Sequence, residues 1–262
     1  MKSSAHPNFE NPPIVEIGIG VAFSKPERLS IGQLGRFWAT IAGDFPYSED
    51  HNPVGSPAEW AASVEGLPLP RLWVIAAGGN TLLQLQVDRF GLNWRRQKDS
   101  DRYPDFASRL EAFLGYWKLF CEFAQEVCGG DAAVRSAEII KVSRSHETDG
   151  WAGFEEMAKV CSAVSWPASR DEWKLKHVAL NFGMEHRDGK GRFELKSASA
   201  TADPSRRLLL TEIRVEPNDI RSTLSDLGNL EERLWTGNEL ANLIFTTFAP
   251  LEIQQNAWQR TS

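Results

Sequence analysis

Seven residues between positions 88 and 103 combine charged and polar side chains with aromatic rings, a combination that is typical of recognition sites. They are Asp88, Arg89, Asn93, Trp94, Arg95, Arg96 and Tyr103. An arginine guanidinium binds a carboxylate or phosphate through two parallel hydrogen bonds, and a tryptophan or tyrosine ring offers a face for stacking. These groups would suit a nucleotide or a single-stranded nucleic acid. The alternative is structural: Asp88 pairs with Arg89 or Arg95 to fix a bend, and Trp94 lies in the core.

Two motif-like segments elsewhere are explained more simply as local structure. His186 to Gly189 is similar to the catalytic-loop triplet of kinases, but Asp-Gly between two strands is an ordinary hairpin turn. Gly18 and Gly20 lie inside a predicted strand and lack the third glycine of a dinucleotide-binding fingerprint. Neither segment predicts catalysis.

The remaining reactive side chains form no recognisable site either. The group His146, Glu147, Asp149 and His177 matches no metal-site spacing and is typical of a solvated linker. Cys161 lies on an apolar stripe, where a small core residue is the simpler interpretation. We therefore expect no catalytic residue, no metal site and no cofactor.

Residues 81–96 carry most of the candidate site and have the clearest strand pattern in the chain. Apolar residues occupy every second position from Leu83 to Val87, with polar residues between them. The alternation resumes at Phe90 one residue out of phase, which predicts a bulge or bend at Asp88–Gly91. Gly78-Gly79-Asn80 predicts a tight turn, so residues 71–77 and 81–96 should form a β-hairpin.

The flanking segments complete the first half. Residues 15–23 alternate as a strand, and Ser30 can cap a helix that begins at Ile31 and ends by Gly43. Residues 47–70 are rich in proline and predict a long loop. A helical stripe runs from Tyr103 to Gly129, and 137–143 is a strand. The resulting order, β-α-β-β-α-β, is that of a ferredoxin-like fold, with two helices on one face of an antiparallel sheet.

The second half predicts another sheet with helices. Residues 146–150 read as a linker, 151–164 as a helix, and 174–185, 192–202 and 208–216 as strands. Asp219 can cap a helix that ends at Gly237, after which 239–248 forms a separate helix. We therefore expect an α+β protein with two antiparallel sheet-plus-helix halves, a ferredoxin-like half at 1–145 and an α-β-β-β-α half at 151–262.

Composition excludes several functional classes. The formal net charge is −6, unlike the basic proteins that wrap duplex DNA. Three cysteines without a C-x-x-C pair argue against a disulfide framework or structural zinc. The chain lacks an apolar signal core and a membrane-length apolar run. These features predict a soluble cytoplasmic protein that does not contact membranes.

Several segments of the first half together resemble a known protein family. They are Asn11–Glu16 (NPPIVE), Leu83–Phe90 (LQLQVDRF), Asn93–Arg95 (NWR) and Tyr103-Pro104. The chain resembles a sporadically distributed bacterial family of uncharacterised proteins of about this length. The second half is similar only in its run of strands and its closing helix. A patchy distribution is typical of accessory genes, including bacterial defence and toxin–antitoxin loci.

These observations lead to a functional prediction. No catalytic constellation stands out, and a ferredoxin-like sheet commonly presents an open face or edge to partners. We therefore expect a non-catalytic binding protein that acts with a protein partner, as an accessory component of such a locus. The alternative is a nucleic-acid or nucleotide binder that uses the arginine and tryptophan cluster at 89–96.

Overall fold

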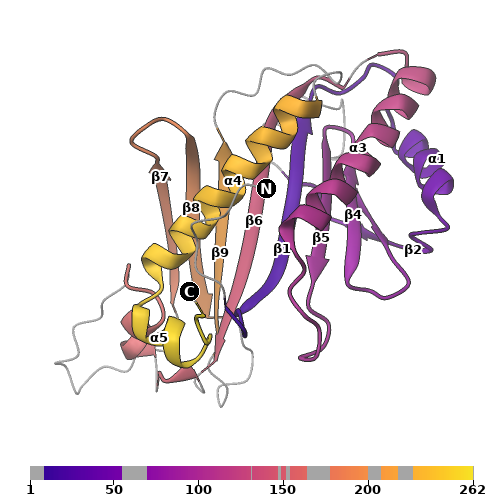
Figure 1. Cartoon of the computed structure of the whole chain (residues 1–262). Helices are drawn as coiled ribbons and strands as arrows, with labels where there is room; N and C mark the ends of the chain where they lie inside the picture. Colours follow the sequence, from indigo (N-terminus) through magenta and orange to yellow (C-terminus); the bar gives the residue numbers. More distant parts are fainter. Residues whose placement is uncertain are drawn as a thin grey trace. The chain divides into compact units, whose positions relative to one another are not determined.

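The computed structural model has an α+β fold built on one large sheet (Figure 1). It describes residues 9–54, 70–130, 132–146, 149–151, 154–163, 178–199, 208–217 and 227–261. Nine strands lie in the order β2-β3-β4-β5-β1-β6-β9-β8-β7. The α+β class is confirmed, but the strands form a single sheet where two were predicted.

The chain divides into two compact units, each assembled from separate segments. One unit, here the arginine unit, comprises residues 18–138 and 219–234, and the other, the lysine unit, comprises 1–17, 139–218 and 235–262. Strands β1 (Ile14–Phe23) and β6 (Val134–His146) and helix α4 (Leu227–Phe248) contribute to both. These units are defined by packing and not by independent folding, so the predicted domains 1–145 and 151–262 stay a prediction.

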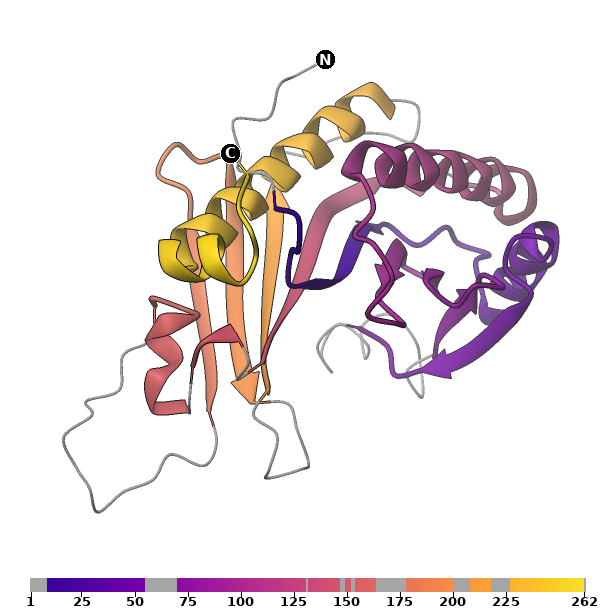
Figure 2. The same ribbon diagram turned by 60° about the horizontal axis from the view of Figure 1, so that its bottom comes forward.

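Two helices cover one face of the arginine unit's strands (Figure 2). They are α1 (Ile31–Ile41) and α3 (Phe106–Cys128), and the main strands beneath them are β3 (Arg71–Ile75), β4 (Thr81–Gln86) and β5 (Arg89–Arg95). Their core is an aromatic cluster around Phe90, whose ring lies 5.4 Å from Trp117 and 6.4 Å from Phe37. The contact between helix and strand rings gives this face a large apolar burial, which anchors β5.

Local sequence signals define both helices. The Ser30 hydroxyl accepts a hydrogen bond from the Gln33 amide at the start of α1, as predicted. Asp105 caps α3 in the same way, by accepting from the Ser108 amide at 3.0 Å. Helix α3 ends at Gly129, whose φ of 68° is left-handed and favours glycine.

The candidate stretch folds differently from its prediction. Residues 81–96 do not form one strand with a bulge, because the chain reverses at Val87 and Asp88 to pair β4 with β5. The change of phase at Arg89 thus reflects a second hairpin. The predicted hairpin between β3 and β4 is confirmed. An additional edge strand, β2 (Tyr47–His51), lies within the predicted loop and pairs with β3, while residues 55–69 of that loop lie outside the described part.

The lysine unit continues with three antiparallel ladders, from β6 to β9 (Leu208–Pro217), β9 to β8 (Gly191–Ser199) and β8 to β7 (Ala179–Glu185). The predicted helix at 151–164 is, in its described part, the short 3₁₀ helix η2 (Phe154–Lys159). Residues 219–226, where a helix was also predicted, lie outside the described residues. On one face of the sheet, Glu212 pairs with Lys196 at 3.8 Å and with Arg214 at 3.6 Å.

The opposite face of the lysine unit packs against α4 and the short α5 (Leu251–Asn256). Helix α4 continues through Gly237, where we expected two helices. A Cβ atom at Gly237 would lie only 3.0 Å from Cγ1 of Ile139, so this glycine allows close contact between helix and strand. Gly237 is therefore required for helix–strand packing, and the prediction that it ends a helix was wrong.

Candidate functional site

The candidate residues fall on two opposite faces of the β4–β5 hairpin. Trp94 lies on the helix-covered face, is 5% exposed, and its ring meets Tyr103 edge to face at 6.1 Å. Burial, with a smaller effect from Asp105, raises the pKa of Tyr103 well above its usual range. Both rings therefore belong to the core, and the proposed stacking role of Trp94 is not available to it.

Arg89, Asn93 and Arg95 alternate with these core residues and lie on the other face, here called the polar face. Arg89 and Arg95 are half-buried, while Asn93 is 4% exposed and accepts a hydrogen bond from Gln84 at 2.8 Å. Arg96 follows β5 and is half-buried. The structure thus separates two arginines of the predicted cluster from its two aromatic rings.

A tryptophan that the sequence analysis did not select forms the centre of the polar face. Trp73 on β3 pairs with Glu49 of β2 and with Gln84 of β4, so these residues share the face. The His51 ring stacks on Trp73 with centroids 3.6 Å apart, and the Arg95 guanidinium lies 4.3 Å from the indole centroid. This cation–π arrangement orients Arg95 and leaves Trp73 only 8% exposed.

Side-chain amides connect the arginines across the polar face. Arg71 lies 5.2 Å from the Trp73 centroid and donates a hydrogen bond from Nη1 to Oε1 of Gln84 at 2.6 Å. The amide nitrogen of Gln84 donates in turn to Asn93. Since the amide oxygens of Gln84 and Asn93 both accept a hydrogen bond, these side chains are held in defined positions.

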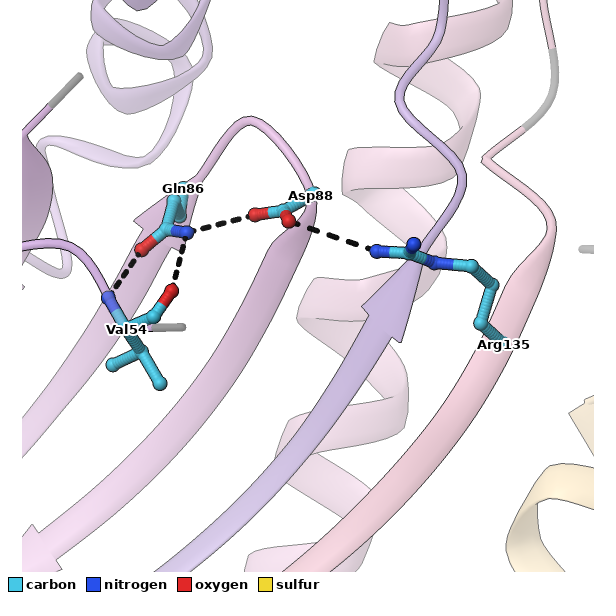
Figure 3. A network of polar contacts seen from close by, with 4 residues as sticks. All are labelled: Val54, Gln86, Asp88 and Arg135. Carbon is cyan, nitrogen blue, oxygen red and sulfur yellow. Dashed lines mark hydrogen bonds and ion pairs between the residues drawn. The ribbon is translucent and has the colours of Figure 1, made fainter. Parts of the chain in front are cut away.

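A second polar network holds the β4–β5 turn (Figure 3). Gln86 accepts a hydrogen bond from the Val54 amide at 2.9 Å and donates to the Val54 carbonyl at 3.0 Å, as a neighbouring strand would. It also donates to the Asp88 carboxylate at 2.8 Å. Asp88 pairs with Arg135 of β6 at 3.6 Å, and not with Arg89 or Arg95 as the structural alternative predicted. The turn is therefore fixed independently of these two arginines.

Arg89 is the exception to this pattern of paired groups. Within the part of the chain that the structure describes, no hydrogen-bond acceptor or carboxylate pairs with its guanidinium, and its Nε is one of several buried arginine Nε atoms without an acceptor. Gly91, two residues further along β5, adds no side chain to the same face. The atom nearest to a Cβ at Gly91 would be the Ile19 carbonyl oxygen at 3.4 Å, which is an ordinary contact.

Sequence patterns indicated only part of this face. His51, Arg71 and Trp73 were missed because they lie on β2 and β3, and only the register brings them next to Arg95. The alternation of Arg71, Trp73 and Ile75 was the available signal, since residues two apart share a face. Strand β2 gave no usable signal, because four of its five residues are exposed and its polarity is that of a loop.

The structure also places the remaining candidate groups. The segment His186 to Gly189 is a hairpin turn, as predicted, with a left-handed φ of 65° at Gly189. Cys161 is buried, and burial raises the pKa of its thiol. Glu147 and His177 lie outside the described residues, and among the residues described no three potential metal ligands come together.

Comparison with known proteins provides no name for the arrangement. Neither a scan against protein-family models nor a search of curated proteins finds a match. The resemblance to the bacterial family thus stays a prediction. Of the helices that the structure describes, none has the length and hydropathy required to cross a membrane.

Proposed function

We propose that this protein is a non-catalytic binding protein, and that the polar face of β3–β5 is where it contacts a protein partner. The observation that carries the proposal is the gathering of Arg71, Arg89 and Arg95 on one face, with Arg95 held against Trp73. Arginine and tryptophan are enriched in the residues that contribute most to protein interfaces.

The charge distribution supports the same proposal. The whole chain carries a formal net charge of −6, so a cationic face is a local departure from the protein's acidic character. An acidic partner would be repelled by the remaining surface and attracted to this face, which favours one binding orientation. A role in a bacterial defence or toxin–antitoxin locus belongs to the same proposal and rests on the sequence resemblance alone.

The test is purification of the tagged chain from its native host under gentle conditions. We expect a stable partner with the unchanged protein and at least tenfold less of it with Arg95→Ala, because that substitution removes the cation stacked on Trp73. Arg187→Ala is the matched control, since Arg187 is exposed in the β7–β8 turn. Recovery of the chain alone, or equal recovery with all three proteins, would contradict the proposal.

A nucleic-acid or nucleotide binder is the second candidate, and the arginines together with the His51–Trp73 stack favour it. Binding would then weaken steeply with salt, since phosphate contacts release counterions. Fluorescence anisotropy with a labelled oligothymidylate measures this directly. An affinity that does not change in Arg95→Ala would remove this candidate.

We further propose a ferredoxin-like arrangement for the arginine unit, with β2 and β3 inserted between α1 and β4. The support is the sheet order β4-β5-β1-β6. When the inserted pair is left out, β1, β4, β5 and β6 are the first to fourth strands of a β-α-β-β-α-β chain. A ferredoxin-like sheet places its second, third, first and fourth strands side by side, which here is the order β4-β5-β1-β6. An experimental structure of the protein tests this arrangement through the strand directions of β1, β5 and β6.

A further inference from the structure

We infer that two copies of this chain associate through β7, which pairs antiparallel with β7 of the second copy about a twofold axis at Phe182. This inference goes beyond the proposed function and does not depend on the polar face of β3–β5. Strand β7 is the last strand of the sheet, and β8 is its one partner among the described strands (Figure 1). The free edge of such a strand carries backbone amides and carbonyls that can bind a further strand.

The hydrogen bonds of the β7–β8 hairpin show which backbone groups face this edge. The His186 amide donates to the Gly191 carbonyl at 2.9 Å, so these residues form a hydrogen-bonded pair of the ladder. Such pairs alternate along an antiparallel ladder, so every second residue from Leu180 to Met184 is also bonded to β8. The backbone groups that point away from β8 belong to Ala179, Asn181, Gly183 and Glu185.

These outward groups match a second copy of the same strand when the two strands overlap fully. A pair centred on Phe182 places Asn181 opposite Gly183 of the second copy, and Ala179 opposite Glu185. Each outward amide and carbonyl then gains a partner on the second strand. Like charges do not meet, because Glu185 is the one charged residue of β7 and it lies opposite an alanine.

The side chains of β7 leave apolar surface that this pairing would cover. Leu180, Phe182 and Met184 share one face of the strand and are only half-buried. The register through β8 aligns Phe182 with Ile213 of β9, which is 2% exposed, so the three side chains lie on the helix-covered face. A second β7 strand would continue this apolar layer and bury more of all three.

Helix α4 adds an exposed apolar side chain on the same side. Leu240 lies over the start of β8, since its Cδ1 is 3.1 Å from the Cβ position at Gly191, whereas Asn242 contacts Lys141 of β6. Leu243 follows Leu240 by three residues, so it lies on the flank of α4 that is nearer to β8 and β7. It is 45% exposed and extends the apolar surface beyond the edge strand.

Strand β2, which ends the sheet order on the other side, does not match a second copy in this way. Full overlap of two β2 strands would bring Glu49 opposite Glu49 of the second copy, with Asp50 next to it. Exposed charges of this kind prevent edge-to-edge association, and the interior of β7 has none. Pairing of β2 with β7 of another copy would also leave one edge open at each end and produce filaments.

Light scattering during size-exclusion chromatography tests the inference on the full chain. At micromolar concentration we expect a mass twice the 29.3 kDa of one chain. Gly183→Pro removes an outward amide but no hydrogen bond to β8, so its dimer should dissociate at least tenfold more readily. Gly183→Ala is the matched control, because it keeps the amide and its Cβ meets no atom within 4 Å; it should stay dimeric.

Three results would overturn the inference: a monomeric unchanged protein, a particle larger than a dimer, or a Gly183→Pro dimer as stable as that of Gly183→Ala. Amide hydrogen exchange, followed by nuclear magnetic resonance in the unchanged protein, provides a test that needs no variant to fold. Raising the protein concentration should slow exchange at Asn181 and Gly183 at least tenfold. Exchange at these two amides that does not depend on concentration would equally contradict pairing through β7.

Discussion

Replacing Lys141 by methionine should make the protein more stable, although it removes a hydrogen bond. Lys141 lies on β6, is 4% exposed, and donates from Nζ to the Asn242 side chain of α4. Among the described residues no carboxylate pairs with it. Burial lowers its pKa from 10.5 to about 7. An ammonium group that is costly to bury in this way destabilises the folded state relative to the unfolded chain.

The magnitude follows from linkage between protonation and folding. A fall in the pKa of Lys141 from 10.5 to about 7 lowers the free energy of unfolding by about 5 kcal/mol below pH 7, at roughly 1.4 kcal/mol per pH unit. The cost is about 4 kcal/mol at pH 7 and about 2 kcal/mol at pH 9. The sign is clear: between pH 7 and 10.5 the unfolded chain binds more protons, so stability rises with pH. Lys141→Met removes this cost but leaves the Asn242 oxygen without its donor, which costs about 1–2 kcal/mol. The substitution should therefore raise the free energy of unfolding by about 2–3 kcal/mol at pH 7.

Urea unfolding of the two proteins at pH 7 and pH 9 measures the effect. The advantage of Lys141→Met should shrink by about 2 kcal/mol at pH 9, where the wild-type amine is neutral. Lys159→Met is the control, because the Lys159 side chain is 54% exposed and its ion pair with Glu156 contributes little. A loss of stability at pH 7, or a difference that is the same at both pH values, would refute the reasoning.

Two further predictions concern α3. Gly129→Ala should lower the free energy of unfolding by about 1 kcal/mol, because Gly129 has a left-handed φ of 68°. Gly115 lies in the middle of the helix, so Gly115→Ala should raise the free energy of unfolding by roughly 0.5–1 kcal/mol. Urea unfolding of the two variants checks both signs. The pKa of Tyr116 is raised to about 12, first by burial and then by its hydrogen bond to Asp44. Ultraviolet titration should show that Tyr116→Phe removes a group that ionises near pH 12, and Asp44→Asn should lower the pKa of Tyr116. A group lost in Tyr116→Phe that ionises at the ordinary tyrosine value, or a Tyr116 pKa that Asp44→Asn leaves unchanged, would contradict this.

Local signals in the sequence predicted the elements that depend on neighbouring residues. Ser30 starts α1, Gly129 ends α3, and the apolar stripe of α3 is buried as expected. Capping, turn chemistry and periodicity act over a few residues, so a single sequence reveals them. The β3–β4 hairpin was predictable for the same reason, since its glycine-rich turn lies between two alternating segments.

Elements that depend on distant contacts were not predictable in this way. Strand β2 is polar and exposed, and only pairing with β3 makes it a strand. Gly237 reads as a helix end, but contact with Ile139 keeps it inside α4. Tertiary packing overrides local preference at both places, because the free energy of distant contacts exceeds the small local propensities.

The sequence by itself determined that Arg89, Asn93 and Arg95 alternate with Phe90, Leu92 and Trp94, so that a strand here would place Arg89 and Arg95 on the face opposite Trp94. Only the tertiary structure decided which other residues share the arginine face. Strand register placed Trp73 and His51 beside Arg95, and the reversal at Asp88 gave that carboxylate to Arg135 while Arg89 stayed unpaired in the described chain. The physical reason is that cross-strand neighbours are set by hydrogen-bond register between segments far apart in the chain, which no local pattern encodes.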